Sequence, residues 1–236
     1  MKLSSVHLQF GAFAVASLLL ASTAAQAFTP PNVRTRPNLR RSGGTRDPIP
    51  TCLANPSEGK VLTAAIPEFA AQTTLPYPVV QWFMPENTAS YLEFQLYQLT
   101  DDDDLIPVYQ MAHALSGEGG IATLALPEHI GVPPLTVGSS YYWSVEVYCE
   151  AGNEQADMSV FGYIDRVEAS AEVQAAIAAA STPVERANIA ADNGLWHDAV
   201  TYLVNDLDAP DAQAAWGTLM EAVNLAELVT EPLIQP

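Results

Sequence analysis

Between residues 61 and 167 the chain alternates short apolar runs with groups of proline, glycine and other turn-forming residues. Runs rich in β-branched and aromatic residues, bounded in this way, are typical of antiparallel strands. Pro107 lies inside the fourth run, and because proline cannot donate a ladder hydrogen bond, we expect that strand at a sheet edge. We predict a seven-stranded antiparallel β-sandwich, with strands over residues 61–67, 77–84, 91–99, 106–111, 121–126, 141–149 and 158–167.

The alternation is clearest over residues 141–149. The odd positions begin with Tyr141 and Trp143 and are expected to face the core, as is Trp82 on the second predicted strand. The even positions then face outward, and Tyr142 and Tyr148, with Tyr97 of another strand, form a candidate aromatic strip for a sugar or peptide. The alternative is ordinary packing across the strands, beneath the helices that follow.

From Glu168 the pattern changes to alanine-rich helix. Thr182-Pro183-Val184-Glu185 is a capping box with proline at the first helical position. We predict about four helices over residues 168–227, with Trp196 and Trp216 on their buried faces, after a sandwich domain of residues 51–167. Residues 193–199 resemble the inter-helix turn of one tetratricopeptide unit, which predicts a helical hairpin and not a repeat array. Residues 228–236 are expected to be a tail.

The first 27 residues have the pattern of a signal peptide. Lys2 precedes an apolar run at 10–21, and Ala25-Gln26-Ala27 supplies the small-x-small cleavage site. That run is shorter than the roughly 20 residues of a membrane span, so we expect export to the periplasm or beyond; a retained N-terminal anchor is the alternative.

Charge is divided unevenly between the next segment and the rest of the chain. Residues 28–50 are rich in arginine and proline with a net charge of +4, whereas residues from Thr51 onward carry −23. Composition predicts that the leader at 28–50 is flexible, either as a solvated tether or as a basic arm that docks on an anionic partner or on the acidic body. The acidic body is expected to be monomeric and to repel nucleic acid and anionic membranes, and no membrane span is predicted after the signal peptide.

Two cysteines remain in the exported chain, Cys52 and Cys149. An exported protein with a single cysteine pair is expected to form one disulfide.

No catalytic or cofactor motif is found among the residue types that carry chemistry. His113, His129 and His197 have no metal-ligand spacing, and there is no nucleophile elbow or phosphate loop. We expect His197 to be exposed and Asp198 to help satisfy the start of its helix. Asp101, Asp102, Asp103 and Asp104 form a candidate calcium site on a turn, although we favour the alternative of a solvated turn that blocks edge pairing.

Two resemblances add to this reading. Val80-x-Trp82-x-x-Pro85 and the segment from Leu135 to Trp143 resemble strands of fibronectin type III modules. That resemblance implies a sandwich of the immunoglobulin or fibronectin type, in which the Tyr141 hydroxyl bonds back to the upstream backbone. Several short motifs follow one another along the chain: Gly44-Thr45-Arg46, Cys52-Leu53, Trp82-Phe83-x-Pro85, the strand ending at Cys149, and Gly194-Leu195-Trp196-x-Asp198-Ala199. Their order is similar to that in the cyanobacterial domain-of-unknown-function family 928. That resemblance implies an exported protein and transfers no catalytic residue.

We therefore expect a non-enzymatic module with no cofactor that contacts a protein or an envelope glycan. A glycan-binding or glycan-cleaving protein, with outward aromatics and paired carboxylates, is the alternative. Calcium-dependent adhesion through residues 101–104 is a third possibility.

Overall fold

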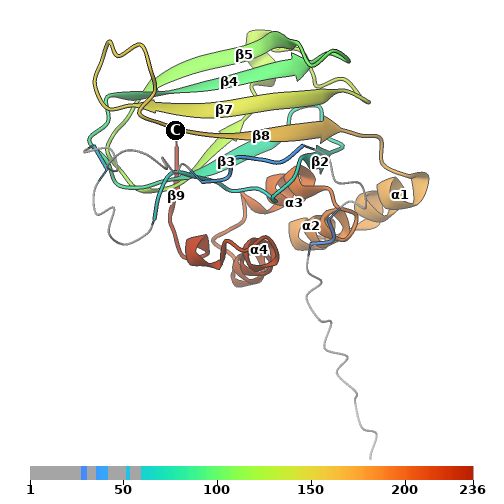
Figure 1. The fold of residues 1–236 in the computed structure, drawn as a ribbon. Coiled ribbons are helices and arrows are strands. Elements are labelled where there is room, and N and C mark those ends of the chain that lie inside the picture. Colours follow the sequence, from blue (N-terminus) through green and yellow to red (C-terminus); the bar gives the residue numbers. More distant parts are fainter. Residues whose placement is uncertain (1–27, 31–35, 42–51, 54–59, 236) are drawn as a thin grey trace, which may run out of the picture.

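The computed structural model describes residues 28–30, 36–41, 52–53 and 60–235. The predicted signal peptide (1–27) and much of the predicted leader lie outside the described residues. Two β-sheets form one half of the molecule, and the helices gather along one side of them, as Figure 1 shows. The structure contains both β-sheets and α-helices, with the helices after the sheet-rich part, as predicted from the sequence.

The two sheets have different sizes. The smaller has the order β1-β3-β6-β9 and the larger the order β2-β8-β7-β4-β5. Most neighbours are antiparallel, and the short β2 and β9 join their sheets in parallel. The strands are β1 (Thr63–Ala64), β2 (Ala71–Thr73), β3 (Val79–Met84), β4 (Tyr91–Leu99), β5 (Leu105–Ala114), β6 (Gly120–Ala125), β7 (Ser140–Tyr148), β8 (Met158–Arg166) and β9 (Leu233–Ile234).

The prediction of seven strands is wrong in number, because the described chain forms nine. Each predicted run contains a strand, and β5, with Pro107, is at the sheet edge as expected. The two additional strands, β2 and β9, have three and two residues, too few for a period-2 pattern to be visible. The segment expected to be a tail therefore returns to the smaller sheet, where β9 pairs with β6.

Aromatic rings fill the space between the sheets. Trp82 of β3 and Trp143 of β7 are fully buried, and each ring centroid lies 6.2 Å from that of Phe94 on β4. Tyr141 is also buried, and its hydroxyl oxygen accepts a hydrogen bond of 2.7 Å from the backbone N–H of Thr136. The tether from the tyrosine to the upstream backbone is thus confirmed.

Four α-helices follow the sheets in the described chain: α1 (Ala171–Ala179), α2 (Pro183–Asp192), α3 (Trp196–Leu203) and α4 (Pro210–Ala222). The Thr182–Glu185 capping box is present at the start of α2. Gly194 turns the chain between α2 and α3 with φ of +75°, a conformation in which a Cβ atom is strained. Short 3-10 turns, η2 (Glu128–Ile130) and η3 (Ala226–Leu228), complete the helical structure.

Helix α3 covers the part of β3 that the short edge strand β1 leaves unpaired. β1 covers β3 only at Trp82 and Phe83, so the backbone of Val79 needs other partners. His197 Nδ1 lies 2.9 Å from the carbonyl oxygen of Val79, and the N–H of Val79 donates to Thr201 Oγ1 at 3.1 Å. Two side chains one helical turn apart therefore satisfy both backbone groups of this residue.

The next residue of α3, Asp198, reaches the larger sheet. Its carboxylate accepts hydrogen bonds from the Thr73 hydroxyl at 2.6 Å, from the Thr74 N–H at 2.9 Å and from the Thr74 hydroxyl. Burial raises the pKa of Asp198, while the threonine hydrogen bonds and the positive charge of Arg166 oppose that rise. We call the contacts of His197, Asp198 and Thr201 with the two sheets the α3 clamp.

The expected roles of His197 and Asp198 are therefore wrong. Both side chains are almost completely buried, and the N-cap position of α3 has no side-chain hydrogen bond. Neighbouring residues of a helix point in different directions, as expected. His197 points to β3 of the smaller sheet and Asp198 points to β2 of the larger sheet.

The described parts of the predicted leader are packed against the body, which differs from the expected flexible segment. Phe28 is buried edge-on against Trp196, with ring centroids 5.3 Å apart. Residues 36–41 form isolated bridges to both sheets, through Leu39 with Phe161 and Arg41 with Thr63. Arg41 also pairs with Glu227, as a basic arm docked on the acidic body would.

The disulfide between Cys52 and Cys149 is present, with their Cα atoms 5.5 Å apart. It joins the chain before β1 to the residue after β7. The adjoining Leu53 bridges to Asn87, and the Cys52 carbonyl accepts a hydrogen bond of 2.7 Å from Thr88. Cys52 and Leu53 are both buried, so the disulfide joins a segment that is packed into the core.

The buried imidazole predicts a pH dependence of stability. Burial lowers the pKa of His197 to about 4, from an ordinary value of 6.5. Between these values the unfolded chain binds more protons, so stability should fall as the pH drops through this range. By about pH 5 the free energy of unfolding should have lost roughly 2 kcal/mol relative to neutral pH. Urea unfolding of the wild type and His197→Gln, which keeps a hydrogen-bond donor without titrating, measures this loss. Equal pH dependence in both proteins would contradict the assignment.

The disulfide closes a loop of 97 residues, which predicts a large effect on stability. Replacing both cysteines with alanine should lower the free energy of unfolding by about 4–5 kcal/mol, because the unfolded chain regains the freedom of that loop. Chemical unfolding of Cys52→Ala/Cys149→Ala measures the loss. A loss below about 1 kcal/mol would show that the bond constrains little.

Candidate functional site

The outward face of the larger sheet carries a cluster of aromatic side chains. Tyr142 of β7 is at its centre, with ring centroids 5.4 Å from Phe161, 5.6 Å from Tyr163 and 6.3 Å from Tyr97. All four rings are half-buried, and burial raises the pKa of Tyr142. We call this side of β4, β7 and β8 the outer face. In Figure 1 the helices lie below β8, next to β2 and β3, and α3 contacts both of these strands.

Tyr148 lies on the same face, at the far end of β7 from Tyr142. It is only 7% exposed, and its ring stacks on Tyr91 with the centroids 4.5 Å apart. Its hydroxyl donates to Glu146 at 3.1 Å, and burial together with that carboxylate raises the pKa of Tyr148 to about 12. The predicted strip is therefore two separate aromatic groups, with Tyr97 and Tyr142 in one and Tyr148 in the other.

Two carboxylates occupy the outer face between these groups. Glu93 of β4 and Glu146 of β7 are direct cross-strand partners, so their side chains leave the sheet next to one another. Gln95 donates to Glu93 at 3.3 Å, and the same Gln95 accepts a hydrogen bond of 2.6 Å from the Tyr97 hydroxyl. The polar residues thus connect the acidic pair to the aromatic cluster.

A polar groove of about 470 Å³ lies at the end of the sheet nearest the aromatic cluster. Arg36 and Asp101 both line it. Arg36 also pairs with Asp103, and its guanidinium is 5.7 Å from the centre of the Tyr163 ring, so this arginine connects the groove to the cluster. Other lining residues are Gln98, Leu99, Thr100, Gly138, Ser139 and Ser140.

The four consecutive aspartates at 101–104 form the turn between β4 and β5 and are all exposed. Asp103 has a positive φ of 63° there, and Thr100 and Asp104 close the turn with backbone hydrogen bonds. Among the described residues, no group of three or more histidine, cysteine, aspartate or glutamate side chains could hold a metal ion. The geometry does not favour a calcium site at this turn.

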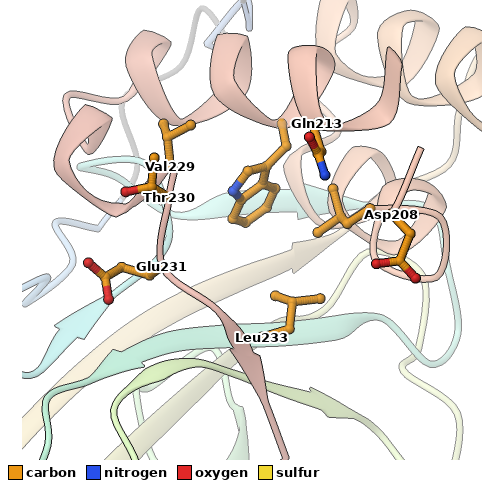
Figure 2. Close-up of a pocket in the computed structure, with 8 residues that line it drawn as sticks. Asp208, Gln213, Val229, Thr230, Glu231 and Leu233 are labelled. Carbon is orange, nitrogen blue, oxygen red and sulfur yellow. The ribbon is translucent and has the colours of Figure 1, made fainter. Parts of the chain in front are cut away.

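A second hollow, of about 500 Å³, lies between α4 and the chain that leads into β9 (Figure 2). Asp208 and Gln213 line one side of it, and Thr230, Glu231 and Leu233 line the other. Trp216 also lines this hollow but is 4% exposed, in keeping with its predicted place on a buried helix face. Glu231 is paired with Lys60.

The histidines do not form a catalytic arrangement. His113 and His129 are exposed on β5 and η2, whereas His197 belongs to the α3 clamp. Within the described ranges, no helix is long and apolar enough to cross a bilayer. The outer face presents aromatic rings, amides and carboxylates.

Sequence reasoning missed Glu93, Phe161 and Tyr163 on the outer face, and it did not identify the partner of Glu146. The alternation of β7 places Glu146 on the outward side, but which residue of β4 lies opposite it depends on strand register. Register follows from the turns and the buried faces of both strands, which the pattern of one strand does not contain. The alternation of β8, in which Phe161 and Tyr163 occupy every second position, is the signal that could have found those two rings.

Comparison with known proteins supports one assignment. A family model described as Domain of Unknown Function (DUF928) matches residues 41–233, which is most of the chain. A comparison with curated proteins gives no match. The matched residues include both cysteines, the two sheets, the four helices and the α3 clamp. The chain therefore belongs to the DUF928 family.

Proposed function

We propose that this protein is an exported, non-enzymatic binding module that contacts a protein or an envelope glycan through its outer face. The observation that carries the proposal is the cluster around Tyr142, whose rings lie on a sheet face away from the helices. Neighbouring aromatic side chains provide contact area at a small cost in conformational entropy, as interfaces require.

Export is supported by the signal-peptide pattern of residues 1–27 and by the Cys52–Cys149 disulfide, since disulfides persist in oxidising compartments. We also propose that the sandwich is of the fibronectin type III kind. The seven predicted strands are ordered β1-β3-β6 and β8-β7-β4-β5, and Tyr141 makes its backbone tether, as that resemblance implies.

Glycan binding is the second candidate, favoured by the combination of aromatic rings with Gln95, Glu93 and Glu146. A glycan-cleaving enzyme would also use paired carboxylates, but it would need them to flank a bound sugar in a site that holds it in place. This pair lies in the middle of a sheet face and not in either of the two hollows described above, which favours binding over cleavage.

The proposal predicts that the mature protein co-sediments with isolated cell envelopes of its source organism. Tyr142→Ala should weaken this binding by about tenfold or more, because it removes the ring that the other three contact. Tyr142→Phe, which keeps the ring, should bind within about twofold of the wild type. Ile130→Ala is the control, because Ile130 is 69% exposed on η2, outside the outer face.

A folded Tyr142→Ala protein that binds as the wild type does would contradict the outer face as the binding surface. Soluble sugar products that appear with the wild type and not with Glu146→Gln would instead support the cleaving enzyme. Thermal melting of each variant shows whether it is folded.

A further inference from the structure

The acidic pair on the outer face has no positive partner within the described chain. The ion pairs among the described residues are Arg36–Asp103, Arg41–Glu227 and Lys60–Glu231, and none of them involves Glu93 or Glu146. Glu93 and Glu146 instead receive hydrogen bonds from the neutral side chains of Gln95 and Tyr148. The two carboxylates are therefore held in position without being neutralised.

Two like charges directly opposite one another on an antiparallel sheet destabilise it. Half-burial strengthens the repulsion, because less water screens each charge. A ligand that places a positive charge between the two carboxylates removes this repulsion and adds attraction to both. Electrostatics of the free protein therefore favour a cationic ligand at this position.

The aromatic rings on either side favour the same kind of ligand. Tyr91 and Tyr148 lie beyond the pair toward one end of the strands, and Tyr97 and Tyr142 lie toward the other. Faces of aromatic rings attract ammonium and guanidinium groups. Arg36 gives an example beside the same face, because its guanidinium lies over the Tyr163 ring and pairs with the Asp103 carboxylate.

The net charge of the body and the length of the outer face further restrict the kind of ligand. The body from Thr51 onward, with a net charge of −23, repels phosphate-bearing partners and attracts basic ones. Tyr142 and Tyr148 are six residues apart on β7, or roughly 20 Å, which is also the span of about six residues of an extended peptide. A neutral glycan would use the rings but would leave the acidic pair unneutralised.

We propose that the outer face recognises an extended basic segment of a partner protein, with an arginine or lysine side chain placed between Glu93 and Glu146. This inference rests on the proposed function, since it names the ligand class of the same surface. Tyr142 and Tyr97 contact the side chains that precede or follow the basic residue.

The test uses a labelled peptide of alternating arginine and glycine, and a matched peptide in which neutral citrulline replaces each arginine. The mature full-length protein should bind the arginine peptide about tenfold or more tightly than the citrulline peptide at low salt. Glu93→Gln/Glu146→Gln should remove at least about nine-tenths of that affinity and, by ending the repulsion, raise the Tm. Glu128→Gln/Glu221→Gln is the matched control, because it removes two exposed charges elsewhere.

Equal losses in both double variants would overturn the inference, since they would show attraction to the whole acidic body and not to this pair. Equal binding of the two peptides, or binding of neutral or amino-sugar oligosaccharides in preference to the arginine peptide, would also overturn it. In that last case the Tyr142→Ala effect on envelope binding would remain, so the outer face would stand as the binding surface with a different ligand.

Discussion

The structure depends on the burial of two adjacent polar side chains, His197 and Asp198, between helix α3 and the two sheets. Burying a polar group is costly unless it is hydrogen-bonded, and here every contact is made with a strand end: Val79 of β3, and Thr73 and Thr74 at the end of β2. Because β3 belongs to the smaller sheet and β2 to the larger, one turn of helix connects both. The helical segment is thus part of the same fold as the sandwich.

This arrangement determines which surfaces are free. The α3 clamp packs the helices against β2 and the start of β3, and the described leader residues form bridges to β1 and β8. The outer face over β4 and β7 is left without a helix (Figure 1), so its rings and carboxylates are available for a partner. The structural role and the proposed binding role therefore fall to residues that alternate along the same strands, as Tyr141 and Tyr142 illustrate.

Patterns in the sequence predicted the features that depend on residues close together in the chain or on a single cysteine pair. The bounds of β4, the capping box of α2, the tether of Tyr141 and the Cys52–Cys149 disulfide all follow from alternation, capping chemistry, a short motif or a cysteine count. The strands β2 and β9 have too few residues to show a period, and they form because a sheet edge is available. Burial of His197 could not be predicted either, since it depends on the unpaired edge of β3 beyond the two-residue β1. The Glu93–Glu146 pair likewise depends on a register that two distant turns determine together.

Amide hydrogen exchange of the native protein tests the central claim, that the α3 clamp makes the sheets and helices one cooperative unit. The Thr74 N–H is bonded to Asp198 and the Val79 N–H to Thr201, so both amides report directly on the clamp. Both amides are expected to exchange only through global unfolding, with the same free energy of opening as the Val145 amide in the centre of β7. Exchange of Thr74 and Val79 through a separate, less costly opening, while Val145 stays protected, would contradict it.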